Sequence, residues 1–474
     1  MCGTRHQSPM LQKLCVLVGL AALALCTQAL VQFEMDLPYD HFNKSSQLGT
    51  FKLPFTASQA KRTDYAFVFI NDEHFALDNS SPESQSELFK TYGADTDKFT
   101  FYWVPLRMYS LSTPVAGPAR ETFTTANMIA DLYHVLSYSA YLKDTRRIIL
   151  VGSGHGATIA ALYRQQFQRS HFAVIGAVAD TPRLERVKSS AFYDREEPEA
   201  HPACADRIST ASKHLATILS SADAAGITRV TKGLNLCAEP DVSSAEAVGF
   251  FWHSVMHPYV RAMSAPGTTE LQPFAGEPAL CAAFSPDASA LDEFMAAHMR
   301  LREDPARCLN VKLGAWSTDA GAKTERLELL RACVDTASFG TSSGDDSIYV
   351  PKSPALRVEY FNAPCQLYVG SHFTAAHAFE LAAANTQQYH GKQDFRGTNV
   401  FFVRAIKDYL AGFAPSQERS PVPERSVVKD YSGYRGHTLR VARDNDPEDA
   451  RIVRSAMIDF VRNLIEICPG YDVC

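Results

Sequence analysis

The stretch RRIILVGSGHGATIAALYRQQF (146–167) constrains the fold of this chain more than any other segment. An apolar run, residues 148–151, leads into three glycines at alternating positions, and a helical pattern of small and apolar residues follows. Short apolar runs bounded by glycine are typical of buried strands, and apolar residues three and four apart are typical of a helix. The stretch therefore predicts a buried strand, a tight turn and a helix.

The glycine spacing selects the residue at the tip of this turn. A strand–turn–helix that presents a nucleophile needs small residues two positions before and two positions after the tip. A frame centred on Gly154 is flanked by Gly152 and Gly156, whereas a frame centred on Ser153 is flanked by a valine and a histidine, which are too bulky. The spacing thus predicts glycine at the tip, with Ser153 one residue early. The alternative is a glycine-rich turn of an α/β fold without any chemistry.

Further apolar runs predict the rest of the sheet. A helical pattern at 125–142 separates two of them, and alternating strands and helices favour a parallel sheet that is covered on both faces. The predicted strands are residues 65–70, 99–104, 147–152, 173–179 and 399–405.

The pattern changes between residues 189 and 349. The segments ADRISTASKHLATILSSADAAG (205–226) and ALDEFMAAHMRLRED (290–304) are amphipathic at helical spacing. We therefore predict an α/β core in two halves, residues 30–188 and 350–474, with a disulfide-bonded helical cap inserted at 189–349. The last helix is expected at residues 447–467.

The N-terminus has the pattern of a secretory signal peptide. Basic residues precede an apolar run at 14–26, which is too short to span a bilayer and ends near Ala29. We expect a signal peptide at 1–29 and no later membrane span. A bacterial lipoprotein signal at Cys26 is the alternative, although Leu25 is large for one. Sequons at Asn43 and Asn79 predict glycosylation, so the mature protein is expected to be secreted or lysosomal.

The cysteine count agrees with an oxidising compartment. Three of the 11 cysteines lie in the signal segment, which leaves eight for up to four disulfides. Spacing does not determine their connectivity; Cys204 with Cys237, Cys308 with Cys333 and Cys468 with Cys474 are pairs to test. No CxxC pair or cysteine–histidine cluster has zinc spacing, so no metal or cofactor is expected. A net charge of -6 without a basic stripe argues against nucleic-acid binding.

Several segments resemble one family in order and spacing from about residue 37 to residue 461. The chain is similar to the serine peptidases that include lysosomal prolyl carboxypeptidase, dipeptidyl peptidase II and thymus-specific serine protease. The matching segments are LPYDHFN (37–43), TTANMIADL (124–132), ATIAALYR (157–164), VIGAVADTP (174–182), LLRACVDTASFG (329–340), CQLYVGSHFTAAHAFELAAANTQQYHG (365–391) and TNVFF (398–402).

This resemblance implies an α/β-hydrolase core with a helical cap, and a Ser-His-Asp triad that cleaves peptides next to proline. The family's serine falls on Gly154, its aspartate on Asp408 and its histidine on His437. The order of nucleophile position, aspartate and histidine is that of an α/β-hydrolase. The resemblance also suggests a homodimer.

Other segments near the family's active site are altered. The family's G-G-E-G is NDEH (71–74) here, or else FINDEH (69–74) matches an upstream Y-W-V-N-D-x-H of the family and no G-G-E-G follows. The family's E-H-R-Y-Y-G is PLRMYS (105–110), which keeps Arg107 and Tyr109. Four neighbours of Asp408 are replaced, and Arg440 stands where the family has an aspartate after the histidine.

Glycine has no hydroxyl, and loss of a triad serine costs about a million-fold in kcat. We therefore expect a secreted, inactive peptidase homologue, in which Asp408 and His437 form a structural pair and the old cleft binds peptides with proline near an end, or a protein. One alternative is an active exopeptidase that uses Ser153 with Asp408 and His437. Another is an interaction glycoprotein without a ligand in its cleft. His155 could act as a base or ligand, but is expected to be a polar residue at the cleft mouth.

Overall fold

A computed structural model describes most of the chain that follows the expected signal segment. The described residues are 30–43, 45–71, 86–109, 118–145, 147–170, 173–184, 204–264, 281, 289–302, 304–313, 323–339, 358–389, 395–406, 414–415, 426–432, 438–440, 446 and 448–467. The expected signal peptide at 1–29 therefore lies outside the described residues.

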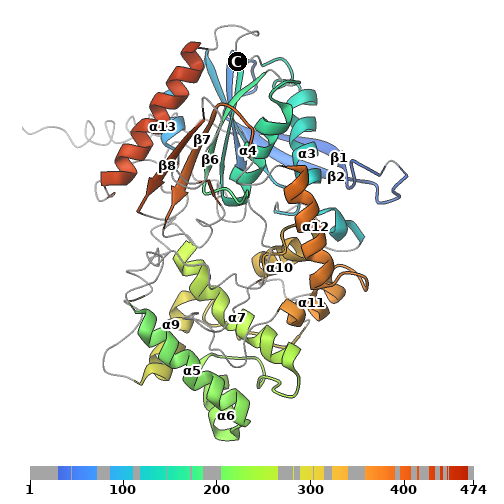
Figure 1. The fold of residues 1–474 in the computed structure, drawn as a ribbon. Helices are drawn as coiled ribbons and strands as arrows, with labels where there is room; N and C mark the ends of the chain where they lie inside the picture. Colours follow the sequence, from blue (N-terminus) through green and yellow to red (C-terminus); the bar gives the residue numbers. More distant parts are fainter. Residues whose placement is uncertain are drawn as a thin grey trace, which may run out of the picture.

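An eight-stranded sheet forms the core, in the order β1-β2-β4-β3-β5-β6-β7-β8 (Figure 1). Strand β2 is antiparallel to both of its neighbours, and the other pairs from β3 to β8 are parallel. This order, with a glycine turn and a helix after β5, is the architecture of an α/β-hydrolase. The strands are β1 (Val31–Pro38), β2 (Thr50–Ala57), β3 (Tyr65–Asn71), β4 (Phe99–Pro105), β5 (Arg147–Ser153), β6 (Val174–Asp180), β7 (Val400–Ala405) and β8 (Val427–Tyr431).

Both faces of the central strands, β3 to β7, are buried, as the apolar runs predicted. Alternate residues of β3 belong to two different apolar clusters: Val68 packs with helices on one face, and Phe67 packs with helices on the other. The first face is covered by α3 (Thr125–Tyr138) and α4 (Gly154–Phe167). The second is covered by α2 (Glu87–Tyr92) and α13 (Glu448–Ile467).

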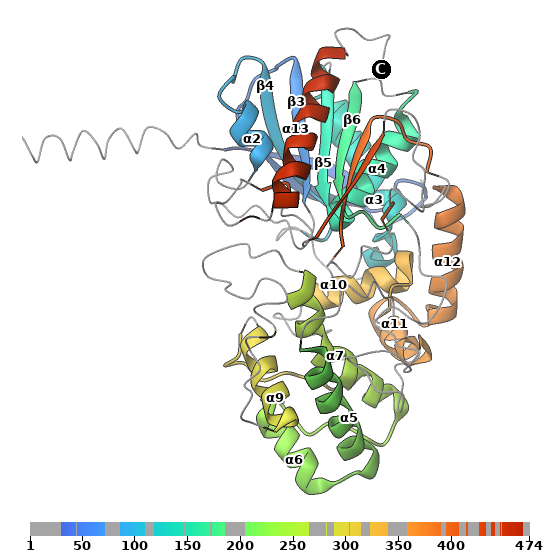
Figure 2. The same cartoon turned by 60° about the vertical axis from the view of Figure 1, so that its left-hand side comes forward.

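The chain between β6 and β7 is helical. Helices α5 (Ala205–Ser221), α6 (Ala224–Gly233), α7 (Ala245–Ser264) and α9 (Ala290–Leu301) share an apolar core of their own. In both views they form a layer apart from the sheet, which we call the cap (Figures 1 and 2). The inserted helical cap agrees with the expectation from sequence.

A second group of inserted helices shares the apolar cluster of the core, and Tyr360 within it also packs against the cap. It comprises α10 (Lys323–Arg331), a π-helical turn η6 (Ala332–Thr336), the 3-10 turn η7 (Val358–Phe361), α11 (Asn362–Tyr368) and α12 (Ala375–Gln388). Their apolar residues, such as Leu330 and Tyr368, belong to the same cluster as α3 and α4. These helices join the cap to the core. The domain boundaries expected from sequence, 30–188, 189–349 and 350–474, stay predictions.

Three disulfides join cysteines of the inserted region and of α11. They are Cys204–Cys281, Cys237–Cys308 and Cys333–Cys365. The pairs considered from sequence, Cys204 with Cys237 and Cys308 with Cys333, are wrong. The fold brings together cysteines 77, 71 and 32 positions apart, which sequence proximity does not indicate. Cys468 and Cys474 lie outside the described residues. Within the described part of the chain, no helix is both long and apolar enough to cross a membrane.

Candidate functional site

The turn between β5 and α4 has an unusual backbone at its tip. Gly154, the first residue of α4, has a φ of 56°, in the left-handed region that side chains rarely adopt. Ser153 precedes it with φ -122° and ψ 146°, which is ordinary extended backbone. The conformational change from strand to helix therefore occurs at Gly154.

The glycines on either side of the tip are required by close packing. A Cβ on Gly152 would lie 2.3 Å from the carbonyl carbon of Gly156, and a Cβ on Gly156 would lie 2.2 Å from the carbonyl oxygen of Ile70 in β3. Neither position has room for a side chain. The turn thus has the glycine pattern of a nucleophile elbow with Gly154 at its centre.

Ser153 lies in the sheet, one residue before the tip. It is buried, it pairs in register with Asp180 of β6, and its side chain makes no capping hydrogen bond to α4. Its backbone is that of a strand residue.

His155 is buried at the start of α4 and faces α3. Its side chain is 4% exposed, and its Nε2 lies 3.1 Å from Sδ of Met128 in α3. The expectation of a polar residue at a cleft mouth is therefore wrong. The first turn of α4 lies close to β3, since a Cβ on Gly156 would lie 2.2 Å from the carbonyl oxygen of Ile70.

A threonine ties the tip of the turn to the chain that leaves β6. Thr158 Oγ1 donates to the carbonyl oxygen of Gly154 at 3.1 Å and accepts from the amide of Arg183 at 2.8 Å. The guanidinium of Arg183 donates in turn to Oγ of Ser338, just after η6. The elbow, the exit of β6 and the end of the π-helical turn are therefore one connected unit.

A buried carboxylate next to the elbow was not anticipated from sequence. Asp180 ends β6, is fully buried, and accepts hydrogen bonds from Thr181 at 2.9 Å and from Thr438 at 3.1 Å. Thr438 is the residue that follows His437. The available signal was positional, because Asp180 comes directly after the predicted strand 173–179, beside the elbow strand.

The structure does not describe the two residues expected to complete the triad. Asp408 and His437 lie outside the described residues, as does Asn79. Asp408 follows Ala405, the last residue of β7, by three positions in the sequence, and His437 follows Tyr431, the last residue of β8, by six.

The residues retained from the family's E-H-R-Y-Y-G segment are part of the framework. Arg107 is 1% exposed and binds the carboxylate of Asp131 in α3 with two hydrogen bonds of 2.7 Å. His41 binds the same carboxylate at 2.7 Å. Tyr109 accepts a hydrogen bond from Arg331 at 2.8 Å. Through Asp131 of α3, these contacts join the chain after β1 to the exit of β4, and the bond between Tyr109 and Arg331 joins that exit to α10.

The described residues offer no site for a metal. Among them, no three histidine, cysteine, aspartate or glutamate side chains are grouped so that they could hold an ion.

Asn43, the asparagine of the first glycosylation sequon, is described and exposed. Its Oδ1 accepts hydrogen bonds from the amide and the hydroxyl of Ser45 at 3.2 and 2.8 Å.

Comparison with known sequences identifies one family. The sequence model described as serine carboxypeptidase S28 matches residues 38–413. No curated protein matches the chain at a significant level.

Solved structures with some likeness to the chain include three hydrolases or esterases. An alpha/beta fold family hydrolase from Bacillus anthracis str. Sterne has 12% identity over 33% of this chain and 45% of its own, with a TM-score of 0.21. An esterase from Pyrobaculum calidifontis has 11% identity over 43% and 61%, with a TM-score of 0.22. An epoxide hydrolase from metagenomes of hot environments has 12% identity over 91% and 99%, with a TM-score of 0.36.

The chain spans less than two thirds of the first two structures. Because all three TM-scores are low, the fold assignment rests on the strand order and the elbow of this chain itself.

Proposed function

Because the chain belongs to the serine carboxypeptidase S28 family, we propose that it is a homologue of the prolyl peptidases in which glycine has replaced the nucleophile. It does not hydrolyse peptides through an acyl-enzyme. It retains the peptide cleft as a binding site for chains with proline near an end.

The observation that carries this proposal is the backbone of Gly154. The nucleophile of an elbow sits at the strained residue between strand and helix, and Gly154 is the residue of this turn with positive φ. Glycine offers no hydroxyl to attack a carbonyl carbon and no proton for a histidine to remove. Without the serine, catalysis falls by about a million-fold.

The proposed partners of the missing nucleophile follow the ends of adjacent strands. Asp408 comes after β7 and His437 after β8, which agrees with the chain order of an α/β-hydrolase triad. The hydrogen bond from Thr438 to Asp180 supports this assignment, since it attaches the residue after His437 to the strand beside the elbow. In the absence of a serine, we propose that Asp408 and His437 serve as a structural pair.

Ser153 is a poor substitute nucleophile. It is 2% exposed, its backbone is extended, and its register partner on β6 is Asp180. A nucleophile in the strand would not be presented above the turn, where the backbone amides of the helix start can stabilise an oxyanion.

The place of action is proposed to be the secretory pathway, either outside the cell or in lysosomes. Three disulfides support an oxidising compartment during folding. The exposed side chain of Asn43 in its sequon agrees with this route.

Peptide turnover and peptide binding together test the proposal. The purified mature protein is incubated with peptides that carry proline next to the first or the last residue, and products are followed by mass spectrometry. We expect no turnover above buffer, and saturable binding by calorimetry that a peptide with alanine in place of proline does not show. Turnover that Ser153→Ala abolishes would establish the active-enzyme alternative. Absence of both turnover and binding would favour an interaction glycoprotein whose cleft holds no peptide.

A further inference from the structure

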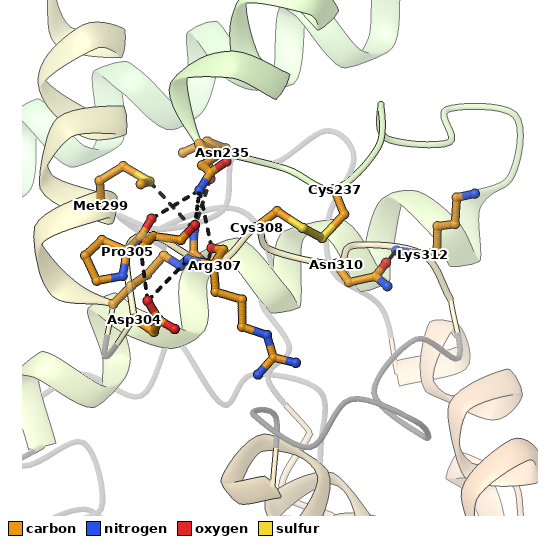
Figure 3. Close-up of a disulfide and its surroundings, with 12 residues drawn as sticks. Asn235, Cys237, Met299, Asp304, Pro305, Arg307, Cys308, Asn310 and Lys312 are labelled. Atoms are coloured by element: carbon orange, nitrogen blue, oxygen red, sulfur yellow. Dashed lines mark hydrogen bonds between the residues drawn. A yellow bond between two sulfur atoms is a disulfide. The ribbon is translucent and has the colours of Figure 1, made fainter.

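The three disulfides differ in their accessibility to solvent. Cys333 and Cys365 are both fully buried. Cys204 is 7% exposed, and Cys281 is half-buried. Cys237 and Cys308, by contrast, are both exposed. The exposed pair joins the segment after α6 to the loop after α9 (Figure 3).

The two segments that this disulfide joins are also paired through their backbones. The amide of Cys237 donates to the carbonyl of Leu309 at 3.0 Å, and the amide of Leu309 donates to the carbonyl of Asn235 at 2.8 Å. Leu236 and Leu309 form a parallel bridge between these bonds. The pairing is made by backbone hydrogen bonds in addition to the sulfur–sulfur bond.

A single asparagine side chain holds the loop that leads to Cys308. Figure 3 shows Asn235 directed at this loop, where its Nδ2 lies within 3.1–3.5 Å of the carbonyl oxygens of residues 305, 306 and 307. The carboxylate of Asp304 accepts from the amides of residues 306 and 307 on the other side of the same turn, at 3.1 and 3.2 Å. The loop conformation is thus fixed by side chains as well as by the disulfide.

Two further contacts anchor the loop to the helices of the cap. The guanidinium of Arg302 donates to the carbonyl oxygens of Leu234 and Arg307. Beyond the disulfide, Val311 is buried in the apolar core of the cap. We therefore expect both cysteines to stay near each other when the sulfur–sulfur bond is cleaved.

We propose that Cys237–Cys308 is a thiol–disulfide exchange site for small thiols such as glutathione or free cysteine. Exposure decides which disulfide a thiolate can reach, and exposed disulfides are the exchangeable ones in folded proteins. The pairing around this disulfide makes its opening reversible, because the two sulfurs stay close enough to rejoin. The site does not depend on the fate of the peptidase centre.

The exchange proceeds in two balanced steps. A thiolate attacks one sulfur of the pair, forms a mixed disulfide with that cysteine, and releases the other cysteine as a thiolate. A second thiolate then attacks the mixed disulfide, which yields the oxidised small-molecule disulfide and a second protein thiolate. Two electrons pass from two thiols to the protein. In the intermediate state, the cap carries a covalently attached thiol compound and one free cysteine.

Native reduction followed by peptide mapping tests this site. The folded mature protein is treated with increasing glutathione, quenched with iodoacetamide and digested. We expect Cys237 and Cys308 to be alkylated at least about tenfold faster than Cys333 and Cys365, since the latter pair is out of reach of solvent thiols. The near-ultraviolet circular dichroism spectrum should not change, and oxidised glutathione should restore the disulfide.

Two variants control for structural effects. Cys237→Ser with Cys308→Ser should abolish the rapid alkylation without changing the spectrum. Asn235→Ala keeps the disulfide but removes the loop contacts, and should slow reoxidation after complete reduction. Equal alkylation rates for the exposed and the buried pair, or loss of the spectrum in step with reduction of Cys237 and Cys308, would overturn the proposal.

Discussion

Gly152 and Gly156 approach each other so closely that a Cβ on Gly152 would lie 2.3 Å from the carbonyl carbon of Gly156. This contact packs the end of β5 against the first turn of α4. The residue halfway between the two glycines is Gly154, whose φ is positive. The sequence spacing and the backbone thus select the same tip residue.

Gly152→Ala should destabilise the protein by about 3 kcal/mol, because the added methyl group overlaps backbone atoms that cannot move aside. Urea unfolding at neutral pH measures the loss. Gly49→Ala is the control, since Gly49 has positive φ but no atom lies within 4 Å of the place that its Cβ would take. Backbone strain alone should cost that variant about 1 kcal/mol. Equal losses would contradict the packing argument.

Asp335→Ala should cost about 3 kcal/mol. This fully buried carboxylate accepts hydrogen bonds from the amide and hydroxyl of Thr125 at 3.1 and 2.7 Å and from Asn385 at 2.7 Å. Its removal leaves buried donors unsatisfied. Asp223→Ala is the comparison. Asp223 is an exposed helix cap that accepts a hydrogen bond from the amide of Ala225 at 3.1 Å, and its loss should lower the free energy of unfolding by about 1 kcal/mol. Thermal unfolding ranks the two variants, and an equal or reversed order would disprove the role of burial.

A fully buried histidine, His298, and a half-buried one, His253, should make the cap less stable in acid. Burial lowers the pKa values of His253 and His298 to about 3, whereas the unfolded chain binds these protons near pH 6.5. The contribution of each neutral histidine to the free energy of unfolding is therefore fully present above pH 6.5. It falls as the pH drops below 6.5, by about 2 kcal/mol per histidine at pH 5.

Unfolding of the wild type and of His298→Leu at pH 7.5 and pH 5.0 checks this prediction. The variant should lose less stability than the wild type on acidification. His372→Gln is the control substitution, because the His372 side chain is 62% exposed. An unchanged slope in His298→Leu would refute the assignment.

Asn43 should carry a glycan when the protein is made in a eukaryotic secretory system. Its side chain is exposed, and the hydroxyl of Ser45 donates to its Oδ1 at 2.8 Å. Treatment of the wild type with N-glycosidase should increase its gel mobility by the loss of the Asn43 glycan. Asn43→Gln and Ser45→Ala should each lack this glycan before treatment, whereas Ser46→Ala should retain it. Identical mobility for all three variants would show that the sequon is not used.

The sequence predicted the central strands and missed the outer ones. Strands β3 to β7 are buried on both faces and appear as continuous apolar runs. Strand β1 alternates instead, with exposed Gln32, Glu34 and Asp36 between half-buried or buried apolar residues, so it contains no apolar run. A search for alternation would have found it.

The sequence also located the elbow but not its surroundings. The spacing of Gly152, Gly154 and Gly156 is a local signal that follows from sterics. Asp180 and Thr438 meet across 258 positions of sequence, and the disulfide partners meet through the packing of separate helices. Such contacts depend on the assembled sheet and cap, which no local pattern encodes.

Fluorophosphonate labelling of the wild type and of Gly154→Ser tests the central claim most directly, because the probe reports an activated serine without knowledge of the substrate. We predict that the wild type is silent, and that any label gained by Gly154→Ser maps to position 154. Labelling of the wild type that Ser153→Ala abolishes would contradict the account and establish an active enzyme with a displaced nucleophile.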